Sequence, residues 1–361
     1  METVGLLTFH QVANYGAVLQ CYALRKLIEA EGFPCRIIPH ICPQLKRNEQ
    51  YLKLNKSLPV SILKYLSQSG GVRKKRAAFD AFLRDCCGYP ETAAAPDWNY
   101  GRIVVGSDQV WNLRLTGGDM AYYLKDVPCG RKIAYAASFG EFAVSQSDIR
   151  AVADYVKDFS RVSVRERTAR ELLRAENIDA EVVCDPVLAI GREEWARFTR
   201  PAFAEKRPYI LVYCVEGARA VFDFARALSK SRNMRAVYIN QKLFFREKGL
   251  EYVRGTSPED FLNYFRYADA VVTNSFHGSA FSVIFGKPFA VDALWRGKPN
   301  GRVRNLLSEF GLQRTIQDIS AKGISVFEEG IDFQAVWKKQ GRMSRTARAF
   351  LHDALREPDA K

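Results

Sequence analysis

The alternation of short apolar runs with segments of helical periodicity constrains the fold of this chain most strongly. Such alternation is typical of parallel strands joined by crossover helices, and it predicts an α/β protein. In the first half of the chain we expect strands at 4–9, 35–39, 103–106, 132–137, 162–165 and 181–184. A second alternation predicts strands at 209–214, 236–239, 270–273 and 288–292.

The length of 361 residues exceeds the usual size of one domain, so we expect two Rossmann-like, doubly wound domains facing a cleft. Ligands of open α/β sheets bind beyond the carboxyl ends of the strands, and we expect a site there. The predicted divisions are an N-terminal domain at 1–190 with a basic, partly helical insertion at 42–98, a linker at 191–207, a C-terminal domain at 208–325 and a basic helical tail at 326–361.

The formal net charge of +14 predicts an anionic partner, which is a nucleic acid, a phospholipid surface or a phosphorylated small substrate. We expect no nucleic acid, because the sequence lacks a motif in which aromatic and basic residues interleave along a groove. The basic cluster 73–76 lies in a stretch with amphipathic helical spacing. That cluster is either a solvated helix face or a contact with a membrane surface.

The beginning of the sequence indicates no secretion signal, because a strand-like run at 4–9 stands where a basic region and a long apolar stretch would be needed. No window approaches the 18 or so apolar residues of a membrane-spanning helix. The eight cysteines form no C-x-x-C pair, so we expect reduced thiols. The expected location is the cytoplasm, with peripheral contact to the inner face of the membrane as an open alternative.

The loop 8–17 between the first strand and the first helix contains Asn14, Tyr15 and Gly16. Backbone amides at a helix start bind anions or sugar hydroxyls, which makes these residues candidates for binding a ligand. A single glycine at this point is equally a feature of turn geometry.

The loop 106–112 follows an apolar strand and contains Ser107, Asp108, Gln109 and Trp111. Amides and a carboxylate pair with hydroxyls, and an aromatic ring covers the apolar face of a sugar, so this mixture suits a carbohydrate. Asp108 as a helix cap and Trp111 as a core residue are the alternatives. We favour the functional reading, because loops at strand ends often carry function.

Arg165 and Arg167 lie at the end of the strand predicted at 162–165. Side chains alternate along a strand, so Arg165 and Glu166 point to opposite faces. Arginine donates two parallel hydrogen bonds to phosphate or carboxylate, which makes Arg165 a candidate anion ligand. On the residues alone, a surface ion pair is the better reading.

The segment 270–288 is the most informative part of the sequence. A buried strand leads to Asn274, Ser275 and His277, one of four histidines, before a helix of small and apolar residues. The positive potential at a helix N-terminus disfavours the protonated imidazole, so His277 would be available as a neutral base. A histidine whose ring nitrogens only tie the loop together is the alternative.

At these residues the sequence resembles the polysaccharide pyruvyl transferase family, over roughly residues 3–314. The resemblance rests on segments in the family's order: NYGAVLQ at 14–20, GSDQVWN at 106–112, SVRE at 163–166, CDPV at 184–187, NSFHG at 274–278 and an arginine-containing helix at 301–312. The resemblance implies the two-domain fold of the glycosyltransferase B type, with phosphoenolpyruvate near the C-terminal domain and the acceptor on the N-terminal side.

By that resemblance, His277 is the catalytic acid or base. The implied phosphoenolpyruvate ligands are Arg165, Asn274, Ser275, Lys287 and Arg302, and the implied acceptor ligands are Asn14, Tyr15, Gly16, Ser107, Asp108, Gln109 and Trp111. Many relatives have arginine and leucine before the histidine, where this chain has Ser275 and Phe276. One expected anion contact is therefore missing, and Arg302, Arg304 or Lys287 is expected to compensate.

The predicted activity moves a pyruvyl group from phosphoenolpyruvate onto a sugar of a cell-surface polysaccharide or its lipid-linked precursor, as a cyclic ketal with release of phosphate. We expect no metal and no cofactor besides this donor co-substrate. One alternative is a sugar-nucleotide glycosyltransferase, but no acidic residue occurs between Asn274 and Ala290, where many retaining enzymes of that fold have a glutamate. A non-catalytic protein that binds anions or saccharides is the other alternative.

Overall fold

The computed structural model describes residues 2–49, 58–90, 95–140, 145–201, 208–215, 219–239, 247–295, 298–313, 319, 327 and 330–357. The chain divides into two compact units. Unit 1 comprises residues 1–61, 79–190 and 342–361, and unit 2 comprises residues 62–78 and 191–341.

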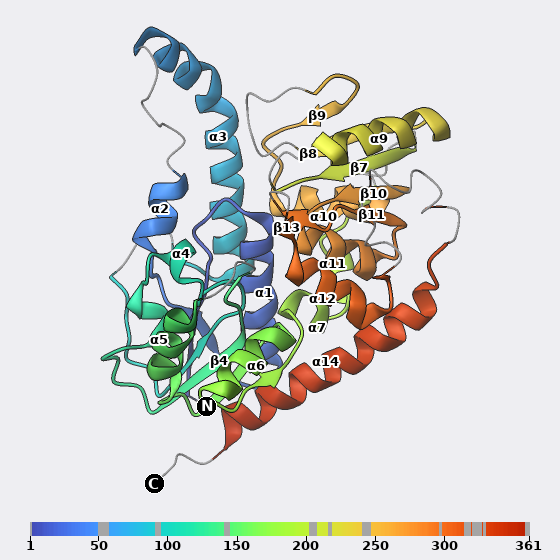
Figure 1. Ribbon diagram of the computed structural model, residues 1–361. Helices are drawn as coiled ribbons and strands as arrows, with labels where there is room; N and C mark the ends of the chain where they lie inside the picture. The colour runs from blue at the N-terminus through green and yellow to red at the C-terminus, as the bar shows by residue number, and fades with distance from the viewer. Residues whose placement is uncertain are drawn as a thin grey trace. The chain divides into compact units, whose positions relative to one another are not determined.

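The sheet of unit 1, whose strand β4 is labelled in Figure 1, is parallel throughout, with strand order β2-β1-β3-β4-β5-β6. Its central strands are buried on both faces, because helices cover a parallel sheet on either side, and this explains their continuous apolar runs. The strands are β1 (Val4–Leu7), β2 (Cys35–Ile37), β3 (Arg102–Val105), β4 (Arg131–Ala137), β5 (Arg161–Val164) and β6 (Glu181–Val182).

The helices of unit 1 begin with caps that the sequence supplies. Ser145 and Asp148 form a reciprocal capping box at the start of α5 (Gln146–Val156), and Asn112 caps α4 (Leu113–Thr116). Helix α1 (Tyr15–Ala30) is buried along most of its length and packs against β2 and α7. The remaining elements are α2 (Pro43–Glu49), the 3₁₀ helix η1 (Met120–Tyr123), α6 (Arg167–Ala175) and α7 (Pro186–Ala189).

Unit 2 contains a second parallel sheet, with strand order β11-β10-β7-β8-β9. Its strands are β7 (Tyr209–Tyr213), β8 (Arg235–Ile239), β9 (Glu251–Val253), β10 (Ala270–Thr273) and β11 (Phe289–Val291), and β12 (Leu294–Trp295) pairs antiparallel with β13 (Lys298–Pro299). Its helices are α8 (Arg192–Ala196), α9 (Arg219–Arg232), α10 (Pro258–Tyr267), α11 (Phe276–Phe285) and α12 (Gly301–Phe310).

Two long helices contribute residues to both units. Residues 62–78 of α3 (Leu58–Cys87) group with unit 2, and the last turns of α14 (Phe333–Arg356) group with unit 1. Within unit 2 the Trp337 indole donates to the Val283 carbonyl, and within unit 1 Ser344 donates to the Ala189 carbonyl. In the basic cluster 73–76, Arg73 and Lys74 are exposed.

The fold class predicted from the sequence, α/β with parallel sheets, is confirmed. Each predicted strand is present, with shifts of one or two residues at its ends. Strand β9 was not expected, because an edge strand of three partly exposed residues carries no apolar run. Among the described residues, no helix combines the length and apolarity needed to cross a membrane.

Candidate active site

Most of the predicted site residues lie at the carboxyl edge of a sheet, meaning the edge at which its parallel strands end. In unit 2 the turn from β10 into α11 is fixed by hydrogen bonds from its own side chains. Thr273 Oγ1 donates to the Tyr213 carbonyl at 2.6 Å and accepts from the Ser275 amide at 3.0 Å. Ser275 Oγ caps α11 by accepting from the Gly278 amide at 3.3 Å. Asn274 Oδ1 accepts from the Val215 amide, which ties this turn to the end of β7.

His277 occupies the first turn of α11, directly beyond this turn, and its residue exposure is 8%. Its ring packs edge-on against Phe276 with the ring centroids 5.2 Å apart. The backbone amides of the first helical turn and the positive end of the helix dipole lie at the same place. The turn therefore combines an imidazole with a backbone site suited to an anion.

The same turn requires a glycine at position 278. A Cβ on Gly278 would stand 2.3 Å from Thr273 Oγ1, a side chain already held by the Tyr213 carbonyl. We expect Gly278→Ala to lower the free energy of unfolding by about 1–3 kcal/mol through overpacking. Thermal and chemical denaturation measure the change. Gly301→Ala is the matched control, because nothing lies within 4 Å of a Cβ placed at this position at the start of α12. If Gly301→Ala lost as much stability as Gly278→Ala, overpacking against Thr273 would not be the cause.

The neighbouring strand β11 leads to a second helix start. Asn300 caps α12 by accepting from the Val303 amide at 3.0 Å, and half-buried Arg302 lies in the first turn. Helices α11 and α12 pack together. The sequence reasoning missed Asp292, which is buried at the end of β11, where its amide donates to the Thr273 carbonyl and its Oδ1 accepts from the Leu294 amide. Its position as the last residue of the strand predicted at 288–292 was the available signal.

The predicted role of Lys287 is corrected by its position. Lys287 follows the C-terminal cap Gly286 of α11 and precedes β11, so it lies at the amino edge of the sheet. At a rise of about 1.5 Å per residue, ten helical residues separate it from His277 by roughly 15 Å. Lys287 and His277 therefore do not hold one small ligand together.

Burial, with Arg266 and Arg192 nearby, lowers the pKa of Lys287 below its ordinary value. Between the lowered pKa and 10.5 the unfolded chain binds more protons than the folded chain, so this residue makes stability rise with pH in that window. We expect Lys287→Met to be more stable than the native protein near neutral pH, with the difference shrinking as the pH approaches 10.5. Chemical denaturation of both proteins from near neutral pH to pH 10.5 measures the difference in their free energies of unfolding. A difference that stays constant over this range would contradict the lowered pKa of Lys287.

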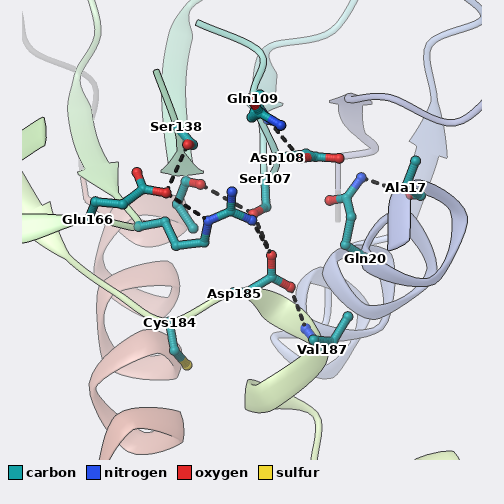
Figure 2. Close-up of polar contacts among 12 residues, drawn as sticks. Ala17, Gln20, Ser107, Asp108, Gln109, Ser138, Glu166, Cys184, Asp185 and Val187 are labelled. Atoms are coloured by element: carbon teal, nitrogen blue, oxygen red, sulfur yellow. Dashed lines mark hydrogen bonds and ion pairs between the residues drawn. The ribbon is translucent and has the colours of Figure 1, made fainter. Parts of the chain in front are cut away.

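In unit 1 the carboxyl edge carries a buried ion-pair cluster. Arg165 follows β5, its side chain is 3% exposed, and its guanidinium lies 2.8 Å from Asp185 Oδ2 and 3.1 Å from Glu166 Oε1. Glu166 also accepts from Ser138 Oγ at 2.8 Å. Figure 2 shows both carboxylates, with Ser107 and Ser138 beside them. Burial acts to lower the pKa of Arg165, but Glu166 and Asp185 outweigh it and raise that pKa above the ordinary value.

This cluster corrects the predicted role of Arg165. One guanidinium stands against two carboxylates, so the buried cluster carries no excess positive charge with which to attract phosphate or carboxylate. The ion pair that the residues alone favoured is present, although it is buried rather than on the surface. Arg165 supports the loops after β5 and β6, and we exclude it from the anion ligands.

The loop after β3 joins the same region. Ser107 Oγ lies within hydrogen-bond distance of Asp185 Oδ2, and the Ser107 carbonyl accepts from Thr8 Oγ1. Asp108 adopts φ = 72°, its residue exposure is 9%, and its Oδ1 accepts from the Gln109 amide. Gln20 Nε2 lies within hydrogen-bond distance of Thr8 Oγ1 and of the Ala17 carbonyl, so α1 is fixed to this loop region (Figure 2).

Three predicted acceptor ligands are structural. Trp111 is 1% exposed, its Nε1 donates to the Tyr122 carbonyl, and its ring packs among core aromatics, so no face is available to a sugar. Tyr15 is equally buried and packs against Phe79. Asn14 caps α1 by accepting from the amides of Gly16 and Ala17.

Ser107 and Gly16 are also buried at this edge. Among the predicted acceptor ligands, Asn14 and Gln109 are half-buried and Asp108 is 9% exposed. The role of Asp108 and Gln109 in binding an acceptor stays a prediction. In the described part of the chain no three side chains of the metal-binding types come together.

Both units define an α/β protein with the fold of the glycosyltransferase B type. UDP-GlcNAc 2-epimerase from Neisseria meningitidis, bound to UDP-GlcNAc, has a TM-score of 0.50 and 11% identity, covering 99% of this chain and 100% of that one. A protein from Listeria monocytogenes assigned as a UDP-N-acetylglucosamine 2-epimerase has a TM-score of 0.50 and 12% identity, covering 99% and 97%. At such identities the likeness shows the fold alone.

The family is shown by sequence. The profile of the polysaccharide pyruvyl transferase family matches residues 14–291, which is most of the chain. A search of curated proteins finds no significant match. This chain belongs to the polysaccharide pyruvyl transferase family, and the resemblance noted from its motifs is confirmed. The family supports a polysaccharide-modifying enzyme, a transferase that acts on a saccharide.

Proposed function

We propose that this protein transfers the pyruvyl group of phosphoenolpyruvate to a saccharide of a cell-surface polysaccharide or its lipid-linked precursor, forms a cyclic ketal and releases phosphate. The observation that carries the proposal is the turn from β10 into α11, where His277 stands at a capped helix N-terminus on the carboxyl edge of the unit 2 sheet. The family to which the chain belongs supports the same activity.

Phosphoenolpyruvate presents a phosphate and a carboxylate, so its site needs groups that hold two anions. The first-turn backbone amides of α11 and α12 are suited to anions, because they lie at the positive end of a helix dipole. Arg302 in the first turn of α12 adds the cation. With Arg165 and Lys287 removed from the predicted set, the ligands we propose are Asn274, Ser275, Arg302 and these amides.

The addition of the first hydroxyl requires two proton movements that one imidazole can perform. In the first step an acceptor hydroxyl oxygen bonds to carbon 2 of the enol, its proton is lost to a base, and carbon 3 takes up a proton. In the second step a neighbouring hydroxyl of the same sugar bonds to carbon 2, phosphate departs with the bonding electrons and takes up the proton of that hydroxyl, and the ketal closes. We propose that His277 accepts and returns the proton, a role usually worth roughly 100- to 10,000-fold in rate.

The test is incubation of the protein with phosphoenolpyruvate and candidate lipid-linked glycans. Mass spectrometry should find the mass gain of a pyruvyl ketal on the glycan, with one phosphate released for each ketal. The structural neighbour bound to UDP-GlcNAc motivates the alternative, a sugar-nucleotide glycosyltransferase. Release of UDP from UDP-GlcNAc, with no phosphate from phosphoenolpyruvate, would favour that alternative and overturn the proposal.

A further inference from the structure

A histidine–aspartate pair stands at the carboxyl edge of unit 1, and the chemistry proposed for His277 does not use it. His40 follows β2, and its Nε2 lies 2.7 Å from Asp119 Oδ2. The other oxygen of Asp119 accepts from the Ala121 amide and caps η1, so the carboxylate is held on both sides. The side chains of His40 and Asp119 are 17% and 12% exposed, so the pair is mostly buried but open to solvent.

The pairing fixes which ring nitrogen of His40 carries hydrogen. A carboxylate only accepts, so Nε2 donates to Asp119, and the neutral ring then has its lone pair on Nδ1. Burial acts to raise the pKa of Asp119, but its hydrogen bond with His40 and other local contacts, the Ala121 amide among them, outweigh burial and lower that pKa, which keeps the carboxylate ionised. Among the described residues Nδ1 has no hydrogen-bond partner, and it is not buried.

Two aromatic rings, those of Tyr122 and Trp98, lie close to this imidazole. Tyr122 meets the His40 ring edge-on, with the centroids 5.6 Å apart, and is itself buried in the core of unit 1. The half-buried Trp98 ring is tilted against His40, with the centroids 6.1 Å apart. An aromatic surface beside an oriented hydrogen-bond acceptor and a carboxylate is the composition that suits a sugar, whose ring has apolar faces and a rim of hydroxyls.

We propose that Trp98, His40 and Asp119 form a saccharide-binding site in unit 1, in which Trp98 covers the apolar face of a sugar ring and His40 Nδ1 accepts a hydrogen bond from one of its hydroxyls. Asp119 is a positioning residue, because it sets the tautomer and orientation of the imidazole. In this site Trp98, rather than Trp111, provides the aromatic ring that covers the apolar face of the sugar. The inference rests on the proposed function only in identifying the bound saccharide as the acceptor.

The test labels the full-length protein with 5-fluorotryptophan and follows its fluorine resonances by NMR. Trp98→Phe assigns the resonance of Trp98, and the core residue Trp111 serves as the internal reference. The probes are the methyl glycosides of glucose, galactose and mannose. We expect at least one of them to shift the Trp98 resonance in a saturable manner while the Trp111 resonance stays in place.

His40→Gln should weaken that binding at least tenfold, because the glutamine amide can still donate to Asp119 but leaves no oriented imidazole lone pair. The matched control is His352→Gln, since His352 makes a similar 2.8 Å contact with Glu31 on the surface of the same unit and should leave binding unchanged. Melting temperatures of both variants check that they are folded. Equal binding by His40→Gln and the native protein overturns the assignment of Nδ1.

Phosphate release from phosphoenolpyruvate, measured in the same samples, separates this inference from the proposed function. A saturable Trp98 shift without any phosphate release supports the saccharide site and counts against pyruvyl transfer. Saccharide-dependent phosphate release with an unmoved Trp98 resonance overturns the site and keeps the transfer. An unmoved Trp98 resonance with all three glycosides and no release overturns the site as well.

Discussion

Replacing His277 with alanine should lower the rate of phosphate release from phosphoenolpyruvate roughly 100- to 10,000-fold, the range usual for loss of a general acid or base. The capped turn that positions His277 is built by Thr273 and Ser275, whose hydrogen bonds do not involve the imidazole. The turn should therefore remain folded in the variant. Steady-state assays of phosphate release, with an acceptor identified by the ketal assay, measure the effect.

The same variant separates binding from chemistry. The groups we propose for the donor are backbone amides, Asn274, Ser275 and Arg302, so the dissociation constant for phosphoenolpyruvate should change little while kcat falls. Calorimetric titration of the donor measures that constant. His352→Ala is the control, because His352 is exposed on α14 and should leave kcat unchanged. A His277→Ala variant with a near-native kcat would exclude His277 as the proton-transfer group.

Replacing Arg165 with methionine should lower the free energy of unfolding by about 3–5 kcal/mol, because it leaves the carboxylates of Glu166 and Asp185 buried without their cation. Methionine fills similar volume and carries no charge, so the loss reports the unpaired carboxylates rather than a cavity. Chemical denaturation, followed separately in the transitions of the two units, measures the change.

Arg197→Met is the matched control for this substitution. Arg197 pairs with Glu194 at 3.0 Å, but its side chain is 74% exposed, and such surface pairs are worth about 0–1 kcal/mol. The Arg165 variant also tests whether Arg165 is a structural residue rather than an anion ligand. If it kept its stability and lost affinity for phosphoenolpyruvate, Arg165 would be an anion ligand after all, and its interpretation as a structural residue would be wrong.

The sequence predicted the parts of the candidate site that depend on local order along the chain. Strand β10, the cap Ser275 and the position of His277 at the start of α11 follow from an apolar run, a polar turn and a helix of small residues. The donor site at this turn could therefore be proposed before the structure was known. Asp292 was missed because it was the last residue of the strand predicted at 288–292, whereas β11 ends at Val291 and leaves Asp292 in the loop beyond it.

Other roles could not be predicted, because they depend on which distant residues meet. The family resemblance implied that Arg165 is an anion ligand, but Asp185, 20 residues further along the chain, pairs with its guanidinium in the interior. The loop sequence favoured a sugar contact for Trp111, but its ring is buried in the core of unit 1. His40 and Asp119 are 79 residues apart, and nothing in either local sequence indicates their pairing.

The amino-acid sequence by itself determined that this is an α/β protein of the polysaccharide pyruvyl transferase family, and it determined where each polar loop follows a strand. These properties depend on periodicity and short motifs, which are local. The tertiary structure alone decided which of those polar side chains are buried against a partner and which remain available to a ligand. Burial and pairing are set by contacts between segments far apart in the chain, and no local pattern records them.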